Sequence, residues 1–201
     1  MTSTIILIIA TIGCYFLGNI SPSIILGKLI AKKDIRTMGS GNAGTTNVLR
    51  TMGKKAAAFT LVVDISKGAL AVLIGNYFGG QDLAMLCGLA AFIGHIWPAI
   101  YGFRGGKGIA TAAGIIVAIN PLMGLSVAAI ALLTIAIFKR VSVGAMVGAV
   151  CLPFISYLFD PKYFIWAAVL AVIVLIKHRT NFKRLIKGEE PKLSFKKKES
   201  E

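Results

Sequence analysis

Residues 121–159 read PLMGLSVAAIALLTIAIFKRVSVGAMVGAVCLPFISYLF, two long apolar runs parted only by Lys139 and Arg140. Each run approaches the roughly 20 apolar residues that a helix needs to cross the hydrocarbon core of a bilayer. Two such runs with a pair of cations between them predict a helical hairpin in a membrane rather than the core of a soluble domain.

Outward from this hairpin, the rest of the chain repeats the pattern. Of its 201 residues 56% are hydrophobic, which exceeds the apolar share typical of soluble domains. We predict an all-α membrane protein with seven transmembrane helices, at residues 4–31, 56–78, 83–101, 108–119, 121–138, 141–159 and 163–176. They would form a single integral-membrane domain over residues 1–201, with a flexible basic cytoplasmic tail from residue 187.

The charges give this bundle an orientation. Lys and Arg number 22 against 8 Asp and Glu, and 20 of the 22 lie at the end of, or after, the first, third, fifth and seventh predicted helices. Asp82 and Asp160 lie in the opposite loops. The positive-inside rule then places the N-terminus outside and the C-terminus in the cytoplasm. Because the cations lie in short loops beside the membrane, anionic lipids and substrates fit them better than nucleic acid does.

The helix predicted at residues 108–119 is too short to cross a membrane. Twelve residues span about 18 Å as a helix, against a hydrocarbon core of about 30 Å. We therefore expect one short or partly re-entrant helix. Its first N–H groups would point into the protein, where they form an anion site.

Two further features lie within the predicted helices. Ser21–Pro22 predicts a kink in the first helix. Asp64 and Lys67 are three residues apart on one face of the second, and charges at that depth are costly unless paired. A buried ion pair that fixes helix packing is the favoured interpretation. His95, in the third helix, is more often a packing or hydrogen-bonding residue than a catalyst at such a position.

Three polar segments interrupt the apolar chain. The first, GSGNAGTTNVLR (residues 39–50), matches G-x-G-x-x-G, but no strand precedes it, so a dinucleotide-binding fold is excluded. Glycines still let backbone N–H groups approach an oxyanion, and Arg50 adds a fork suited to phosphate. An ordinary interhelical turn would not need so many polar donors.

The second segment is GHIWPAIYGFRGGKGIAT (residues 94–111), which imitates a phosphate-binding loop without matching the Walker A pattern. It places Lys107 at the predicted start of the short helix, where side chain and helix dipole act together on an anion. Gly105, Gly106 and Gly108 surround that lysine.

The third segment is HRTNFKRL (residues 178–185) at the end of the last predicted helix. His178 and Asn181 are three residues apart and therefore share a helical face. Histidine can accept a hydroxyl proton and asparagine can orient the hydroxyl. A membrane-interface position with a solvated basic tail is the competing interpretation, and the residues alone leave the two open. Together the three segments indicate a membrane enzyme or a carrier for phosphorylated molecules.

These three segments closely resemble, in order and spacing, the signature motifs of the membrane glycerol-3-phosphate acyltransferases that use acyl-phosphate, the PlsY family. The resemblance implies transfer of a fatty acyl group from acyl-phosphate to the 1-hydroxyl of sn-glycerol 3-phosphate. The products would be 1-acyl-sn-glycerol 3-phosphate (lysophosphatidic acid) and phosphate, as the first acylation of phospholipid biosynthesis. It implies a multi-pass protein of a bacterial-type cytoplasmic (inner) membrane with a cytoplasmic active site.

The resemblance, with the motif chemistry above, also selects site residues. We expect catalytic groups at Lys107, His178, Asn181 and Ser142. We expect substrate-binding groups at Ser40, Gly41, Asn42, Gly44, Thr46, Asn47, Arg50, Gly105, Gly106 and Gly108.

No cofactor is expected, and no metal, because the acidic residues near the motifs form no convincing cage. The expected partners are glycerol 3-phosphate, acyl-phosphate and membrane lipids, with the soluble enzyme that makes acyl-phosphate as a further candidate and no nucleic acid. The alternative function is a carrier for phosphorylated metabolites. A carrier would call for basic motifs on the outer face and an inverted repeat, and the sequence shows neither.

Overall fold

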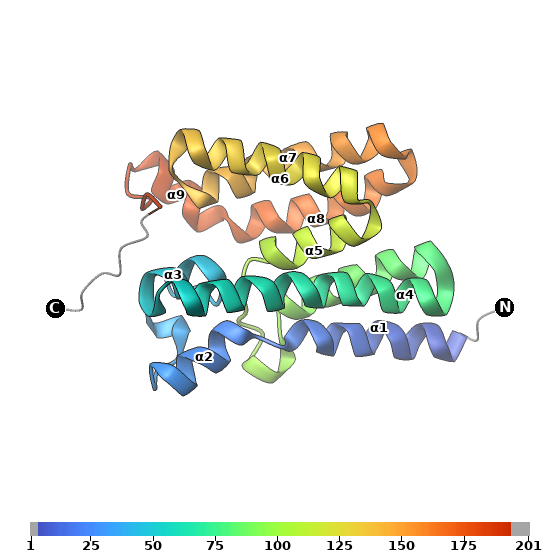
Figure 1. Ribbon diagram of the computed structural model, residues 1–201, viewed down its shortest axis with the longest axis horizontal. Coiled ribbons are helices and arrows are strands. Elements are labelled where there is room, and N and C mark those ends of the chain that lie inside the picture. Colours follow the sequence, from blue (N-terminus) through green and yellow to red (C-terminus); the bar gives the residue numbers. More distant parts are fainter. Residues whose placement is uncertain (1–3, 194–201) are drawn as a thin grey trace. The chain divides into compact units, whose positions relative to one another are not determined.

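The computed structural model describes residues 4–193, and within that range every regular element is a helix (Figure 1). The tail lysines 196–198 lie outside the described residues. The described chain divides into two compact units, one ending at Ile119 and the other formed by Asn120–Leu193. The division falls at Asn120–Pro121, where one predicted helix ends and the next begins.

The first apolar stretch forms two helices, α1 (Thr4–Asn19) and α2 (Pro22–Ile30). Pro22 lacks an N–H and has a fixed φ, so it suits the first turn of a new helix. Asn19 is buried at the break, where its side chain donates to the carbonyl of Tyr15 (2.7 Å) and accepts the N–H of Ile100 (3.3 Å). The predicted interruption at Ser21–Pro22 is confirmed.

A long hairpin, α4 (Lys54–Ile96), is interrupted by non-helical backbone at Gly79 and Gly80. Gly80 has a φ of +68°, a conformation that glycine adopts without steric cost. The two arms run back along each other, because Gly75 lies against the backbone of Ala84 and Gly88 against the side chain of Val72. The helices predicted at 56–78 and 83–101 therefore meet at a tighter turn than expected.

The short helix α5 (Ile109–Ile119) packs directly on α4. Gly114 lies against the carbonyl of Ile65, and Gly68 of α4 lies against the carbonyl of Thr111. Glycine at both contacts lets the two backbones approach closely. The prediction of a short helix at this place is confirmed. The remaining elements of the first unit are α3 (Thr45–Met52) and the 3₁₀ turns η1 (Ile35–Thr37) and η2 (Ala99–Tyr101).

The second unit contains α6 (Pro121–Phe138), α7 (Val141–Phe159), the 3₁₀ turn η3 (Pro161–Tyr163), α8 (Phe164–Lys177) and α9 (Arg179–Ile186). The side chain of Asn120 caps α6 by accepting the N–H of Met123 at 3.0 Å. Lys139 closes α6 in the left-handed conformation, with a φ of +54°. The bounds predicted for α6 and α7 are confirmed.

Four helical stretches of the described residues are long and apolar enough to cross a membrane, at Thr4–Ile30, Lys54–Tyr101, Pro121–Phe138 and Val141–Phe159. The bent pair formed by α8 and α9 would be a fifth. The stretch Lys54–Tyr101 contains both arms of the α4 hairpin, and α5 has only 11 residues. The number of crossings predicted from the sequence, and the side on which each terminus lies, stay predictions.

Candidate functional site

The first polar segment is a loop that leads into α3, and a buried asparagine shapes it. Asn47 is 1% exposed, and its Oδ1 accepts the N–H of Ser40 at 2.8 Å. Its Nδ2 donates to the carbonyls of Ile35 (3.1 Å) and Met38 (2.9 Å). Both N–H groups of this amide therefore bind the loop itself. Asn47 was expected to touch substrate, but the structure gives it the part of holding the loop around Ser40.

The other polar groups of this segment lie nearer to solvent. Ser40 and Gly41 are exposed, Gly41 with a φ of +70°, while Asn42, Gly44, Thr46 and Arg50 are partly exposed. Gly44 is the residue that precedes α3, so the helix starts within the motif. Hydroxyl and amide donors thus lie before and at the start of α3, where a negative charge is favoured, and Arg50 lies in the last turn of the same helix.

The second polar segment folds back on the end of α4 before α5 begins. Gly105 N–H donates to the carbonyl of Ile96 (3.1 Å), and Gly106 N–H donates to the carbonyl of His95 (3.2 Å). Gly108 has a φ of +82° and lies against the ring of Phe92. A side chain at residue 108 would therefore be strained by the backbone conformation and would also collide with that ring. Lys107 is partly exposed two residues before Ile109, the first residue of α5, as predicted.

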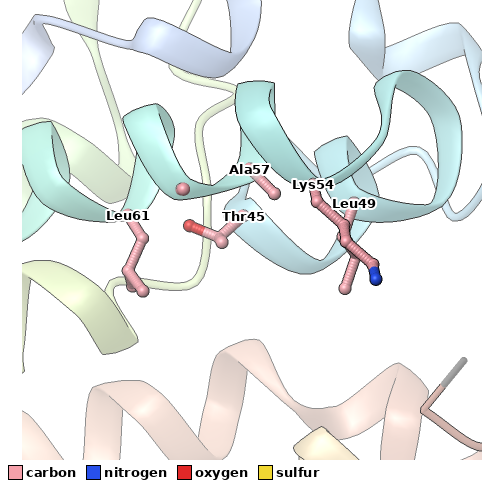
Figure 2. Close-up of a pocket in the computed structure, with 6 residues that line it drawn as sticks. Thr45, Leu49, Lys54, Ala57 and Leu61 are labelled. Carbon is pink, nitrogen blue, oxygen red and sulfur yellow. The ribbon is translucent and has the colours of Figure 1, made fainter. Parts of the chain in front are cut away.

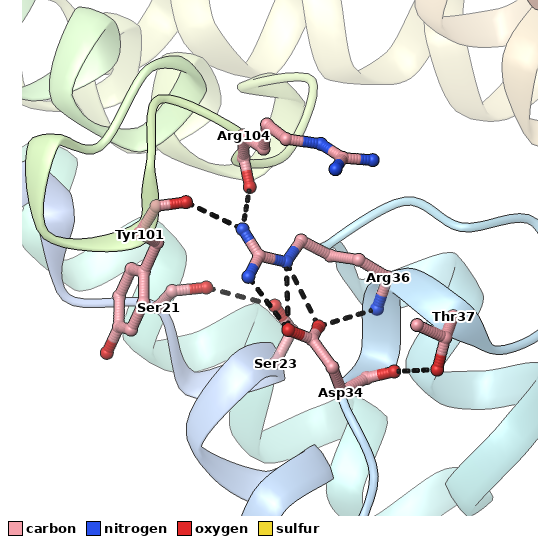
Figure 3. Close-up of polar contacts among 7 residues, drawn as sticks. All are labelled: Ser21, Ser23, Asp34, Arg36, Thr37, Tyr101 and Arg104. Atoms are coloured by element: carbon pink, nitrogen blue, oxygen red, sulfur yellow. Dashed lines mark hydrogen bonds and ion pairs between the residues drawn. The ribbon is translucent and has the colours of Figure 1, made fainter.

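These two segments meet in the first unit. A Cβ atom placed on Gly106 would lie 2.7 Å from the carbonyl oxygen of Ala43 in the first segment. Arg36 adds a second link, because its Nη1 donates to the carbonyls of Tyr101 (2.7 Å) and Arg104 (3.2 Å) (Figure 3). This link was not predictable from the sequence, because the residues that it joins are 65 and 68 positions apart.

The carboxylate of Asp34 fixes the orientation of the Arg36 side chain. The Asp34 carboxylate accepts hydrogen bonds from the side chain and the backbone N–H of Arg36, with Nη2 at 2.8 Å from Oδ2 (Figure 3). The hydrogen bonds from Arg36 lower the pKa of Asp34 below its usual value. The pair therefore stays charged at neutral pH and keeps the guanidinium directed at the second segment.

An open groove of about 480 Å³ begins beside the first segment (Figure 2). Its walls are mostly aliphatic, with the Lys54 ammonium as the only charged group, and the lining residues are Thr45, Leu49, Lys54, Ala57, Ala58 and Leu61. The Oγ1 atom of Thr45 is buried there without a hydrogen-bond partner. The groove is apolar enough for an alkyl chain.

In the second unit a single carboxylate gathers the polar side chains. Glu190 is 5% exposed, and its Oε1 accepts hydrogen bonds from Ser142 Oγ (2.7 Å) and Asn181 Nδ2 (2.6 Å). Its Oε2 pairs with Arg184 Nε at 2.7 Å, and its backbone carbonyl accepts from Arg140 Nε at 3.0 Å. The structure thus brings together two predicted catalytic residues, Ser142 and Asn181.

The charge state of Glu190 follows from these contacts. Burial favours the neutral acid, but hydrogen bonds from Arg184, Ser142 and Asn181 outweigh it and lower the pKa of Glu190 below its usual value. A carboxylate with a lowered pKa is a weak base. Glu190 is therefore suited to orienting Ser142 and Asn181, not to removing a proton from the Ser142 hydroxyl.

Glu190 also changes the description of the C-terminal segment. The flexible tail was expected to start at residue 187, yet the chain is held at least as far as Leu193, whose N–H donates to the carbonyl of Lys139 at 2.6 Å. No role in the site was predicted for Glu190 from the sequence. Between residues 4 and 193 no group of three or more His, Cys, Asp or Glu side chains could hold a metal ion.

His178 lies where α8 ends and α9 begins, and the two helices are bent by 54°. His178 and Asn181 were expected on one face of a continuous helix. Instead the backbone leaves the helical conformation at His178, with its N–H shared between the carbonyls of Val174 and Leu175, both at 3.0 Å. The residues after the bend form a separate short helix, α9.

The hydrogen bonding of His178 settles its tautomer. The side chain is 3% exposed, and Nδ1 lies 2.8 Å from the carbonyl oxygen of Val174. A carbonyl can only accept, so Nδ1 carries a proton and donates it. In the neutral ring the lone pair is then on Nε2, which is the atom able to accept a proton from a substrate.

Comparison with known proteins shows what this chain is similar to. A family model described as glycerol-3-phosphate acyltransferase matches residues 8–188. The glycerol-3-phosphate acyltransferase of Alkaliphilus metalliredigens is 42% identical, covering 94% of this chain and 97% of its own. The protein of that name from Clostridioides difficile is 47% identical, with the same shares covered.

Solved structures agree with the sequence relatives. The crystal structure of PlsY (YgiH), an integral membrane glycerol 3-phosphate acyltransferase, in its glycerol 3-phosphate form is 31% identical, with a TM-score of 0.89. Its lysophosphatidic acid form is 30% identical, with a TM-score of 0.83. Both comparisons cover 94% of this chain and 96% of the other.

Proposed function

The chain belongs to the glycerol-3-phosphate acyltransferase family, and on this premise we propose that acyl-phosphate is its acyl donor. The acyl group passes to the 1-hydroxyl of sn-glycerol 3-phosphate, which gives 1-acyl-sn-glycerol 3-phosphate and phosphate. The related PlsY has been solved in a glycerol 3-phosphate form and in a lysophosphatidic acid form. These two molecules are the acceptor and the product of the proposed reaction. Membership of an acyltransferase family favours an enzyme over a carrier for phosphorylated metabolites.

One observation carries the proposal most directly: two glycine-rich, cation-bearing segments meet in the first unit, each at the start of a helix. Gly44 precedes α3 and Lys107 precedes α5, and Gly106 lies against the carbonyl of Ala43. Backbone N–H groups, helix dipoles and fixed cations together favour phosphate. Both proposed substrates carry phosphate, so two such segments match the chemistry.

The proposed donor needs no covalent enzyme intermediate. Acyl-phosphate is an activated mixed anhydride whose leaving group is phosphate, so clamping both substrates supplies proximity, which can account for about 7–11 kcal/mol of a barrier. The Ser142 hydroxyl donates to a carboxylate that is a weak base, so Ser142 is not activated as a nucleophile. We assign Ser142 and Asn181 to orienting a substrate.

In the chemical step His178 takes the proton of the glycerol hydroxyl at Nε2, and the hydroxyl oxygen attacks the acyl carbonyl. The C–O bond to the donor phosphate then breaks, and phosphate leaves with the electron pair. Lys107 and the loop N–H groups stabilise the oxyanion that forms on the way. The rival route hands the hydroxyl proton to a substrate phosphate oxygen held by Asn181 and Ser142.

The groove beside the first segment is the proposed place for the acyl chain. Its aliphatic wall (Leu49, Ala57, Leu61) continues from Thr45, and Lys54 lies along it (Figure 2). An alkyl chain there would lie next to the phosphate-binding loop with one side against aliphatic side chains.

We further propose that the helices cross the membrane seven times, with the N-terminus outside and the C-terminus in the cytoplasm. The membrane would be the inner one, and the active site would face the cytoplasm. The charge distribution supports this, since the loops with Asp82 and Asp160 carry few cations, whereas 20 of the 22 Lys and Arg lie at the end of, or after, the first, third, fifth and seventh predicted helices.

The test is an assay of the purified protein in detergent with glycerol 3-phosphate and one donor at a time. Acyl-phosphate should give lysophosphatidic acid and an equal amount of inorganic phosphate, whereas acyl-CoA and acyl carrier protein should not. Lys107→Met should strongly reduce kcat/KM under the same conditions. Product formed only from a thioester donor would contradict the proposal.

A further inference from the structure

Beside the Gly105–Gly106 part of the second polar segment lies a cluster of three buried ionisable side chains that the mechanism above does not use, and one of them, His95, belongs to the segment itself. Asp64 and Lys67 come from the first arm of α4 and His95 from the second, and they are 2%, 2% and 6% exposed. Lys67 Nζ lies 2.7 Å from Asp64 Oδ1 and 2.8 Å from His95 Nδ1. The buried pair predicted from the sequence is therefore present, but it has a third member.

The cluster reaches beyond its own helix. An ion pair between residues three apart would add little to the packing of one helix on another. Here, however, Lys67 Nζ also donates to the carbonyl of Ile20 (2.7 Å), at the break between α1 and α2. One ammonium group thus connects the interruption of the first helix to both arms of the α4 hairpin.

His95 carries the connection into the glycine loop. Because an ammonium can only donate, Nδ1 accepts from Lys67, and this fixes the orientation of the ring. The Nε2 edge then lies directly against Gly106, where any Cβ atom would collide with it. The His95 backbone carbonyl accepts the N–H of Gly106 at 3.2 Å and lies against Gly105. The two residues before Lys107, Gly105 and Gly106, are therefore packed directly against His95.

We propose that Asp64, Lys67 and His95 act as a positioning cluster that sets the conformation of the Gly105–Gly106 loop and so places Lys107 for phosphate binding. The inference rests on the proposed role of Lys107. The cluster touches no substrate; it acts through the loop. Replacing a buried ion pair by apolar residues is often neutral for stability, so a loss seen in such a variant reports on positioning.

The test compares Michaelis constants for both substrates in variants of the purified enzyme. Lys107→Met first identifies the substrate whose KM depends on the loop. His95→Asn removes the ring edge beneath Gly106, and Asp64→Leu with Lys67→Met removes the donor to His95 without leaving an unpaired charge. Both should raise the KM of that same substrate by about tenfold or more, the size expected for a lost hydrogen bond to a charged group.

Thr60→Val is the matched control. Thr60 is fully buried on α4, one turn before Asp64, and its hydroxyl donates to the carbonyl of Ala56 within the same helix. This variant should leave both Michaelis constants unchanged. A role of the cluster in stability alone would lower the folded fraction and the thermal stability but leave the KM values of the folded enzyme as in the wild type.

The outcomes separate the two proposals. If Lys107→Met changes neither KM nor kcat, the assigned role of Lys107 fails. If Lys107→Met raises one KM while the His95 and Asp64/Lys67 variants keep the wild-type value, the positioning cluster is overturned and the role of Lys107 survives.

Discussion

At the scale of single residues, His178 and Glu190 have different roles in the second unit: we propose His178 as the base, and Glu190 orients Ser142 and Asn181. The Nδ1–H of His178 is fixed by the carbonyl of Val174, which leaves Nε2 as the basic atom. We expect His178→Ala to lower kcat by about 100-fold or more, since a positioned general base contributes about 10²–10⁴. Steady-state rates with saturating substrates test this, with circular dichroism and thermal unfolding as controls for folding. Near-normal turnover would remove the histidine base and favour proton transfer to a substrate phosphate.

Glu190 stabilises the second unit through its charge. Glu190→Gln loses the ion pair with Arg184 and weakens the bonds to Ser142 and Asn181, so it should destabilise the protein by about 1–2 kcal/mol after allowance for solvent screening. The pKa of Glu190 is lowered in the folded state. Its contribution is therefore complete above the unfolded-state pKa of about 4.3 and is lost as the pH falls through the lower folded-state value.

Thermal unfolding of wild type and Glu190→Gln at several pH values measures this contribution. The difference in Tm between the two should be largest near neutrality and shrink as the pH falls below about 4. A difference that stays constant over the whole range would show that the Glu190 charge does not stabilise the fold.

At the scale of elements, the contact between α4 and α5 depends on glycine. Gly114→Ala would push a methyl group into the carbonyl of Ile65 and towards the N–H of Ala69, both backbone groups that cannot move aside, and should cost about 1–3 kcal/mol. Gly13→Ala is the matched control, because Gly13 lies inside α1 with open space around its Cα. That change should be neutral or slightly stabilising. Equal Tm values for the two variants would contradict the close packing of α5.

Most helices were predictable because membrane helices consist of long runs of apolar residues, which are visible in the sequence. The bounds of α6 and α7 follow from cations and a proline at their ends, whereas the turn at Gly79–Gly80 is tighter than the gap between the helices predicted at 56–78 and 83–101. The bend at His178 was missed because it depends on how the last carbonyls of α8 are capped. Such local hydrogen bonds leave no periodic signal.

The site was predictable only in part, for a similar reason. Gly106 and Lys107 belong to the conspicuous glycine-rich stretch of residues 105–108, and the structure places them just before the short helix α5. Asn47 looked like one more polar donor, yet its partners lie 7 to 12 residues away and make it a loop-shaping residue. Ser142 and Glu190 are 48 positions apart, so only the folded chain shows that they meet.

At the scale of the whole molecule, the central claim is that all three motifs face the cytoplasm. The most direct test is accessibility labelling of single cysteines at exposed positions, in a background where Cys14, Cys87 and Cys151 are replaced by alanine. Ser40, Arg104 and Arg179 represent the motifs, and Asp82 and Lys162 the opposite loops. In sealed vesicles of known orientation, an impermeant reagent should reach the first three only from the cytoplasmic side and the last two only from outside. Labelling of positions 40 and 179 from opposite sides would contradict the account.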